Sequence, residues 1–293
     1  MTLKLNLNGS AEPFINYLKS YLRIRESLLL EIDTNLRAFV AKTFTEDRSS
    51  VRFSSITFDE ASVSIVSDNG EEERNGERIK VGILIQLKKF IQIVERLGSD
   101  VNEKGESNFN IEIDYEPLQN QKDKSIDFIT TSISFASDIL KMRMDGFRIS
   151  ELTYLSDDKF KNIVFNVTDS VSIKITPSSI SSIIKTSEIV KTDVRKDALV
   201  FYNEDKTLFV KDRGLSSSDK PNFVYKLGEL DTTPIYPINI PITRDRFLKM
   251  LDKADESFSI IIGKNTINGN VDRILFDAVE STTKIVIAAM NDN

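Results

Sequence analysis

The chain has 293 residues, 40% of them hydrophobic, and its 45 acidic residues outnumber its 39 basic ones, which gives a formal net charge of −6. It contains no cysteine and no histidine, which excludes disulfides, thiolate or imidazole metal sites, and catalytic triads built on either residue. No apolar run approaches the roughly 18 residues of a membrane span, and the start MTLKLNLNGS lacks the apolar core of a signal peptide. We therefore expect a cytoplasmic protein without a membrane partner, catalytic residue, metal or cofactor, and we favour a function other than that of an enzyme.

A short alternating strand that runs directly into an amphipathic helix is predicted four times along the chain. The first strand is Leu3–Leu7 and the second is Val81–Leu87. The third is Val171–Ile175 and the fourth is Tyr236–Ile242. A supersecondary unit that recurs in this way is typical of a symmetric architecture and not of a single catalytic cleft.

The segments between the helices are rich in β-branched and aromatic residues and mostly alternate, which predicts strands. The dipeptides Asn69-Gly70, Asn75-Gly76 and Asn268-Gly269 predict tight hairpin turns, because both residue types tolerate positive φ. Each repeat is thus predicted to contain a strand, a helix and about three further strands. Two repeats form a domain whose antiparallel sheet is covered on one face by two helices, so the predicted fold class is α+β with two similar domains.

The predicted domain limits follow from this pairing of repeats. The N-terminal domain is predicted over residues 1–145 and the C-terminal domain over 165–293. Between them, residues 146–164 (GFRISELTYLSDDKFKNI followed by Val164) break the alternation and predict an interdomain connector.

Apolar residues at helical spacing define one face of each helix and place basic residues on the opposite face. The predicted helical stretches, residues 11–25, 86–97, 177–191 and 243–254, carry 12 Lys and Arg against 5 Asp and Glu. The rest of the chain carries 27 against 40. Lys and Arg are good helix formers that commonly decorate solvated faces. Alternatively, a surface that is basic only on its helices would bind a polyanion there and repel it elsewhere.

The order of elements resembles that of ring-shaped DNA polymerase sliding clamps, in particular the trimeric clamps of T4-like bacteriophages and proliferating cell nuclear antigen. The resemblance rests on LNGSAEPFINYLKSYL with SLLLEIDTNLRAFVAKTF, LKKFIQIVERLG with FNIEIDYE, SVSIKITPSSISSIIK with ALVFYNEDKTLFVKD, and INIPITRDRFLKMLDKADESFSIIIG with the ending KIVIAAMNDN. It covers nearly the whole chain. The chain is longer than typical trimeric clamps, with extra residues at 68–78, around 116–125 and in the connector.

The resemblance implies a homotrimeric ring, lined by helices, through which double-stranded DNA passes without recognition of its sequence. It implies that a DNA polymerase is tethered to the ring and that an ATP-dependent clamp loader places it on DNA, in the host cytoplasm if the protein is viral. The implied DNA-binding residues are Lys19, Arg23, Lys89, Arg96, Lys185, Arg246, Lys249 and Lys253. The implied partner-binding residues are Tyr154, Leu155, Leu275, Ala289 and Met290, each of which could instead be an ordinary core or connector residue.

Two other functions remain open from the sequence. A β-rich, trimeric virion structural or adhesion protein would also lack histidine and cysteine. A carboxylate-dependent enzyme could occupy an α+β scaffold. Neither function requires basic residues on all four helices, which is why the clamp is preferred.

Overall fold

The structure is a computed structural model that describes residues 2–67, 80–99, 107–118, 126, 128–137, 140–146, 157–165, 167–190, 197–213, 221–251 and 255–290. Two compact units divide the chain. Unit 1 comprises Met1–Thr43 and Ser54–Asp157, and unit 2 comprises Phe44–Phe53 and Asp158–Asn293. The change of unit near residue 157 falls within the expected connector, whereas the short segment Phe44–Phe53 belongs with unit 2. The domain limits 1–145 and 165–293 stay a prediction.

Unit 1 is a curved, mainly antiparallel sheet with the strand order β3-β2-β6-β8-β7-β1-β5, and β9 pairs with one part of β8. Among the described strands of this unit, only β6 and β8 pair in parallel. The strands are β1 (Thr2–Gly9), β2 (Ser27–Asp33), β3 (Ala38–Phe44), β5 (Val63–Ser67), β6 (Lys80–Gln86), β7 (Ser107–Pro117), β8 (Phe128–Ala136) and β9 (Lys141–Asp145).

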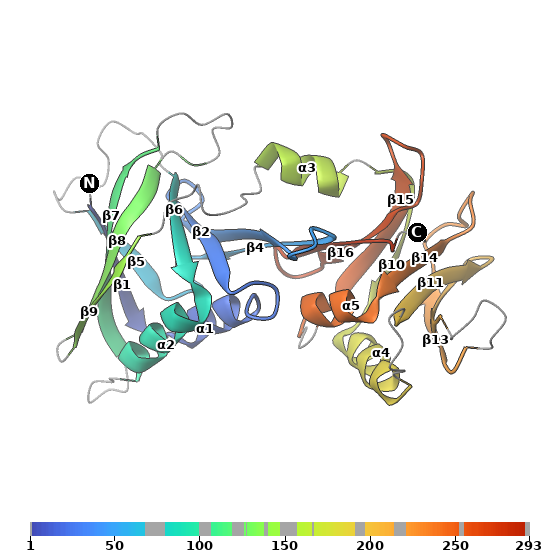
Figure 1. The fold of residues 1–293 in the computed structure, drawn as a ribbon, viewed down its shortest axis with the longest axis horizontal. Helices are drawn as coiled ribbons and strands as arrows, with labels where there is room; N and C mark the ends of the chain where they lie inside the picture. Colours follow the sequence, from blue (N-terminus) through green and yellow to red (C-terminus); the bar gives the residue numbers. More distant parts are fainter. Residues whose placement is uncertain are drawn as a thin grey trace. The chain divides into compact units, whose positions relative to one another are not determined.

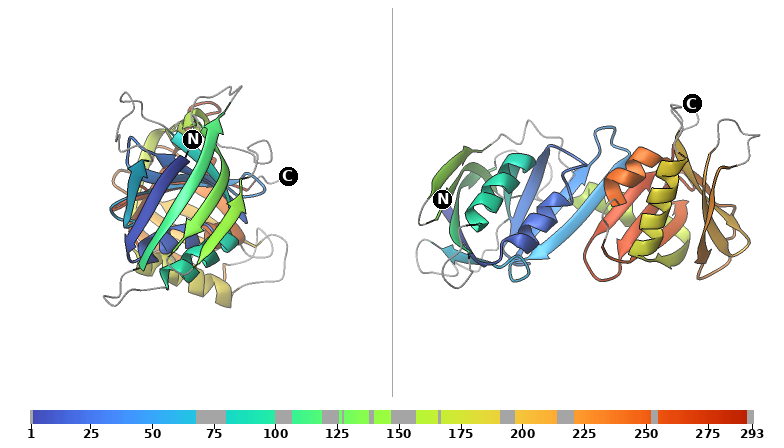
Figure 2. Two further views of the ribbon diagram at one scale, coloured as in Figure 1. Left: turned by 90° about the vertical axis from the view of Figure 1, so that its left-hand side faces the viewer. Right: turned by 90° about the horizontal axis from the view of Figure 1, so that it is seen from below.

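Two helices, α1 (Glu12–Lys19) and α2 (Leu87–Gly98), pack side by side on one face of the unit 1 sheet (Figures 1 and 2). Aromatic side chains fill the space beneath them. Phe14 of α1 lies 4.6 Å from the Phe39 ring of β3 and 6.4 Å from Phe90 of α2, and Phe90 lies 5.4 Å from Phe135 of β8. All four rings are buried, so both helices are fixed to the sheet by the largest apolar side chains of the unit.

Unit 2 contains two sheets. One has the order β13-β12-β11-β14. The other is formed by β10, β15, β16, β17 and residues 50–53, which are the first half of strand β4 (Ser50–Thr57). The remaining strands are β10 (Val167–Ile175), β11 (Ala198–Glu204), β12 (Thr207–Asp212), β13 (Val224–Glu229), β14 (Asn239–Thr243), β15 (Phe258–Asn265), β16 (Arg273–Ala278) and β17 (Lys284–Ala288). The unit's helices are α3 (Asp157–Phe165), α4 (Pro177–Ile189) and α5 (Arg244–Leu251).

The core of unit 2 lies between its two sheets and the helices α4 and α5. Phe247 of α5 lies 6.1 Å from Phe201 of β11 and 6.1 Å from Phe276 of β16, and Phe258 completes the cluster at 6.5 Å from Phe276. The four rings are at most 1% exposed. Strands from both sheets therefore meet at the face that α5 covers.

The four predicted strand-and-helix pairs are confirmed as β1-α1, β6-α2, β10-α4 and β14-α5. Counted over the described residues, three repeats contain three further strands, and the first contains four. The turn predicted at Asn268-Gly269 is present between β15 and β16, with Gly269 at φ 72°. The turns predicted at Asn69-Gly70 and Asn75-Gly76 lie outside the described residues.

One local expectation was wrong, and one element was not anticipated. The first helix ends at Lys19, because the chain then enters a turn in which the Leu22 amide donates to the Lys19 carbonyl, and Leu22 is 40% exposed. The expected connector also contains a helix, α3, which the broken alternation did not reveal. Its buried Phe160 stacks on Phe53 with ring centroids 4.9 Å apart, and its Ile163 carbonyl accepts a hydrogen bond from Arg273 at 3.0 Å.

Candidate nucleic-acid interface

The outward side of α2 in unit 1 carries two adjacent exposed lysines, Lys88 and Lys89. They point away from the sheet because the opposite face of the helix is apolar and buried against the sheet. The buried side chains are Leu87, Phe90, Ile91, Ile93, Val94 and Leu97. Neither lysine has an ion-pair partner among the described residues. Their charges are therefore available to a ligand in solution.

The other cations of this helix pair are partly engaged. Lys19, the last residue of α1, forms an ion pair of 2.7 Å with Glu95 of α2, and both side chains are more than 40% exposed. Arg96 donates to the Ser99 hydroxyl at 3.2 Å where α2 ends. Arg23 is exposed but lies in the turn beyond α1, so it is not on the helix as expected. An exposed ion pair such as Lys19–Glu95 is worth little and exchanges partners easily.

In unit 2, α4 presents one exposed lysine, Lys185. Thr176 caps the helix, because its hydroxyl accepts a hydrogen bond from the Ser179 amide at 3.3 Å, and Pro177 follows at the first helical position. Ile180, Ile183 and Ile184 face the core. Lys185 has no ion-pair partner in the described part of the chain, although Glu188 lies on the same exposed side.

The basic residues of α5 have a different role, because most of them bond to the protein itself. Arg244 is 3% exposed and its guanidinium lies 2.8 Å from Asp197. Lys249 pairs with Asp245 one helical turn earlier at 3.0 Å. Thr243 caps the helix, since the Arg246 amide donates to its hydroxyl at 3.3 Å. Lys253 lies outside the described residues.

Arg246 connects α5 to the segment Phe44–Phe53. Its Nη2 and Nε lie 3.0 and 3.1 Å from the same carboxylate oxygen of Asp47, and its Nη1 donates to the Ala288 carbonyl at 3.3 Å. Burial acts to raise the pKa of Asp47, but hydrogen bonds from Ser49 and Thr45, together with the Arg246 charge, hold the pKa well below its usual range. Asp47 is thus ionised at neutral pH, and Arg246, whose side chain is 19% exposed, is committed to this contact.

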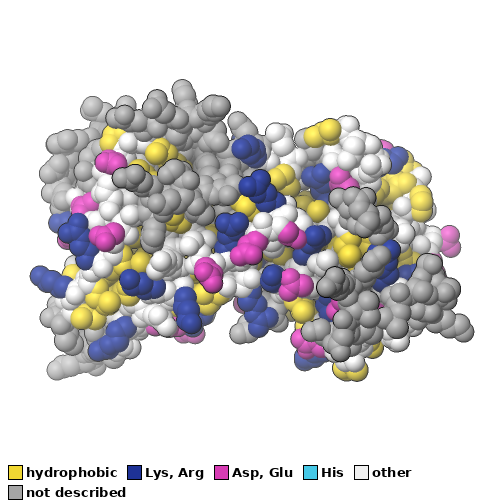
Figure 3. All heavy atoms as spheres, viewed as in Figure 1, with side chains coloured by type: hydrophobic (Ala, Val, Ile, Leu, Met, Phe, Trp, Pro, Cys, Tyr) yellow, Lys and Arg dark blue, Asp and Glu magenta, His cyan; other side chains and the backbone are white. Residues whose placement is uncertain are grey.

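The observed helix boundaries reduce the charge difference inferred from sequence. Within α1, α2, α4 and α5 there are eight Lys and Arg against four Asp and Glu. Basic and acidic side chains are interspersed on the face drawn in Figure 3 and do not gather into a patch of one sign. The ability of a helix to bind an anion therefore depends on which of its basic residues lack an ion-pair partner, and not on its net charge. The sequence argument named Lys89 but not Lys88, although the same apolar spacing directs both outward and could have identified it.

The residues expected to bind a partner are distributed between buried and half-buried positions. Leu275 lies within β16 and is 7% exposed, so it belongs to the sheet core. Ala289 and Met290 follow β17 and are half-buried; the Ala289 amide donates to the Asp272 carbonyl and the Met290 amide to the Pro241 carbonyl, at 2.8 and 2.7 Å. Tyr154 and Leu155 lie outside the described residues.

No cluster of acidic side chains suited to holding a metal ion occurs in the part of the chain that the structure describes. Over the same residues, every helix is too short or too polar to cross a membrane.

Comparison with solved structures identifies the fold. The chain aligns with A. fulgidus PCNA, solved with the C-terminal region of FEN-1, at a TM-score of 0.62 and 9% identity over 99% of both chains. It aligns with the DNA polymerase III β chain of Streptococcus pneumoniae at 0.61 and 12% identity, over 100% of this chain and 66% of that one. The Helicobacter pylori β clamp bound to a DNA ligase peptide gives 0.59 and 14%, over 98% and 67%. No protein-family model and no curated protein matches the sequence. The chain has the sliding-clamp fold, as predicted.

Proposed function

We propose that the chain is a DNA sliding clamp, a ring-shaped processivity factor without enzymatic activity that encircles duplex DNA and tethers a replicative polymerase. The observation that carries the proposal is the alignment of the complete strand-and-helix repeat pattern with PCNA over 99% of both chains. A fold of this kind performs its function by enclosing DNA, so it needs no catalytic group, and the sequence offers neither histidine nor cysteine for one.

The exposed helix cations would contact DNA phosphates loosely and without preference for a base sequence. Lys88 and Lys89 on α2 and Lys185 on α4 are the strongest candidates, because they are exposed and form no ion pair among the described residues. Arg96 on α2 is also exposed but donates a hydrogen bond to the Ser99 hydroxyl. Lys19, Arg23, Lys249 and Lys253 remain candidates of second rank. Arg246 is better explained as a structural residue, since Asp47 and the Ala288 carbonyl already occupy its guanidinium. Phosphate contacts of this kind fix no register along the duplex and therefore permit sliding.

A homotrimeric ring is the assembly that we propose. Among the described residues, β9 pairs with β8 alone and β13 pairs with β12 alone, so each unit offers a strand edge with unused backbone donors and acceptors. Soluble proteins cover such edges, and symmetric association between copies is one way to do so.

The proposed partners are double-stranded DNA, a DNA polymerase and an ATP-dependent clamp loader, in the cytoplasm of a host cell if the protein comes from a bacteriophage. Peptides of FEN-1 and DNA ligase are bound in the aligned PCNA and β clamp structures. We place the corresponding peptide site near Leu275, Ala289 and Met290, with Tyr154 and Leu155 contributed by the connector. Tethering would raise the effective concentration of the polymerase at the primer end.

The decisive experiment asks whether the protein links to DNA topologically. The protein is mixed with a nicked circular plasmid and with the same plasmid cut once, and each mixture is passed through a gel-filtration column at moderate salt. Co-elution with the circle but not with the linear form is expected, because a ring slides off free ends. Native mass spectrometry and electron microscopy of the same sample should show a trimer with a central hole. Monomers at every concentration, with equal retention on both plasmids, would instead favour the virion protein.

A further inference from the structure

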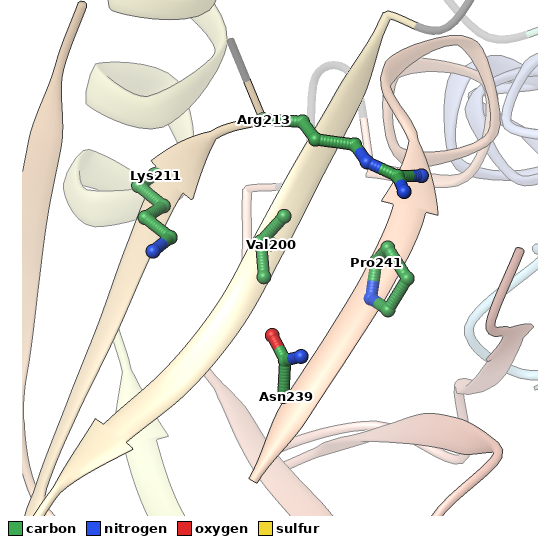
Figure 4. Close-up of a pocket in the computed structure, with 5 residues that line it drawn as sticks. All are labelled: Val200, Lys211, Arg213, Asn239 and Pro241. Atoms are coloured by element: carbon green, nitrogen blue, oxygen red, sulfur yellow. The ribbon is translucent and has the colours of Figure 1, made fainter. Parts of the chain in front are cut away.

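A hollow of about 160 Å³ lies on the outer side of the four-stranded sheet of unit 2, away from the α4 and α5 helices. It is lined by Val200 of β11, Lys211 of β12, Asn239 and Pro241 of β14, and Arg213 just beyond β12 (Figure 4). The register pairs Val200 with both Lys211 and Pro241, so the three side chains project from neighbouring strands to the same side. The alternate residues of these strands point into the core.

The lining has the chemistry of a site for a carboxylate next to apolar groups. Lys211 and Arg213 supply positive charge, Asn239 supplies an amide, and Val200 and Pro241 form an apolar floor. None of the five lining residues is acidic. In Figure 4 the Arg213 side chain extends across the strands toward Pro241, and Lys211 stands on the opposite side of Val200. An anionic group entering the hollow would therefore meet a cation from either side.

An aromatic surface continues from the hollow along the same sheet face. The rings of Tyr202 and Phe209 stack with centroids 5.4 Å apart, and both side chains are half-buried. The Lys211 ammonium lies 4.5 Å from the centre of the Tyr202 ring. Lys226 of β13 is opposite Phe209 in the register and is exposed. Apolar contact area and positive charge thus occur together on one face.

We propose that this hollow binds an acidic peptide segment of a partner protein, with a carboxylate between Lys211 and Arg213 and an apolar side chain against Tyr202 and Phe209. Charge complementarity favours an acidic ligand, and the apolar floor favours a peptide over a free inorganic anion. The inference goes beyond the proposed function, because the hollow lies within one unit and requires neither a ring nor DNA.

A nucleic-acid strand fits this face less well than a peptide does. Burial raises the pKa of Tyr202, and the nearby Glu204 carboxylate raises it further. That carboxylate follows Tyr202 on the same side of β11 and would repel a phosphate chain extended along the sheet. A peptide can place its acidic residues at the Lys211 end alone, so it avoids Glu204.

The test uses the full-length protein and a fluorescein-labelled peptide of sequence Ser-Asp-Asp-Phe-Asp-Asp-Ser, with binding followed by fluorescence anisotropy. The companion peptide has Asn at every Asp position. We expect saturable binding of the acidic peptide that weakens with added salt, and little binding of the Asn peptide. Lys211→Glu should weaken binding by about tenfold or more, because it removes a charged hydrogen-bond donor and adds repulsion. Arg213→Gln should weaken it by a smaller factor.

The matched control is Lys174→Glu, the same charge reversal at an exposed position of β10 in the same unit. It should leave peptide binding within about twofold of wild type. Circular dichroism establishes that each variant is folded. The proposal is overturned if the folded wild-type protein fails to bind the acidic peptide at millimolar concentration, or if Lys174→Glu and Lys211→Glu reduce binding equally. Displacement of the peptide by single-stranded DNA at equal charge concentration would show a general anion site and would also overturn it.

Discussion

The helix pair α1/α2 of unit 1 and the helix pair α4/α5 of unit 2 arise from the same sequence pattern, yet they use their basic residues differently. In unit 1, Lys88 and Lys89 extend into solvent without an ion-pair partner among the described residues. In unit 2, Arg244 and Arg246 bond to Asp197 and Asp47 and hold the fold together. A count of charges along a helix therefore does not reveal which charges can reach a ligand.

The difference has a geometric cause. Arg244 and Arg246 lie in the first turn of α5, where the carboxylates of Asp197 and Asp47 approach their guanidinium groups to 2.8 and 3.0 Å. Arginine presents a planar set of donors that suits carboxylates and carbonyls at such sites. Helix α2 has twelve residues, and Lys88 and Lys89 project from the side opposite its buried apolar residues. Basic residues of α5 thus stabilise the fold, whereas Lys88 and Lys89 of α2 remain available to a ligand.

The largest expected effect concerns the dependence of unit 2 on the segment Phe44–Phe53. Residues 158–293 expressed alone should lack cooperative thermal unfolding, because they lose the β4 pairing with β17, the Phe53–Phe160 stack and the hydrogen bond from Arg52 to the Met250 carbonyl. Circular dichroism measures the transition. A synthetic peptide of residues 44–53 should restore it. A sharp transition without the peptide would contradict the prediction.

The second effect tests whether the two helix pairs differ in binding DNA. Replacing both Lys88 and Lys89 with Ala should reduce retention on circular DNA and make the dependence of log K on log salt less steep, by up to about two units for each subunit that contacts DNA, roughly one for each lost phosphate contact. Lys249→Ala should change retention less, because Asp245 already partly neutralises this lysine. Both proteins should unfold within about 0.5 kcal/mol of wild type. Equal losses of retention would show that pairing within the helix does not matter.

The third effect is on protein stability, where a bonded arginine should matter more than an exposed lysine. Arg246→Ala should lower the free energy of unfolding by about 1–2 kcal/mol, because Asp47 and the Ala288 carbonyl lose a charged donor. Lys185→Ala removes an exposed cation of the same unit and should cost less than about 0.5 kcal/mol. Urea titrations of the two variants provide the measurement. If Lys185→Ala were as destabilising as Arg246→Ala, the assignment of Arg246 to a structural role would be wrong.

The sequence supported the architecture better than the site. Alternating strands followed by apolar positions at helical spacing predicted all four strand-and-helix pairs, because burial of one helix face leaves a direct periodic signal. The pattern did not predict α3, whose few apolar residues include Phe160, since its packing partner Phe53 is far away in the sequence. The resemblance implied a DNA contact for Arg246 and gave no sign of its contact with Asp47, because these two residues are 199 positions apart. Long-range ion pairs leave no local trace.

The smallest expected effect is on the pH dependence of stability. It distinguishes the contact between Asp47 and Arg246 in unit 2 from a carboxylate of unit 1 that has no contact with Arg246 among the described residues. The pKa of Asp47 is held below its usual range in the folded protein, so the contact stabilises the fold above the unfolded pKa of about 3.9 and loses this effect as the pH falls toward the folded value. Asp47→Asn should therefore be less stable than wild type at neutral pH, by about 1 kcal/mol or less because the Asp47 side chain is 50% exposed. The two stability curves should converge below about pH 4.

Asp114 of unit 1 provides the matched comparison, since hydrogen bonds from Ser132 and then Thr2 lower its pKa. Asp114→Asn should show the same convergence with falling pH. In an Arg246→Met background, however, the effect of Asp47→Asn should shrink while that of Asp114→Asn stays unchanged, because Arg246 contacts only the first of these carboxylates among the described residues. Urea titrations at several pH values measure all four differences. An unchanged effect of Asp47→Asn in that background would mean that Ser49 and Thr45, and not Arg246, account for the contribution of Asp47 to stability.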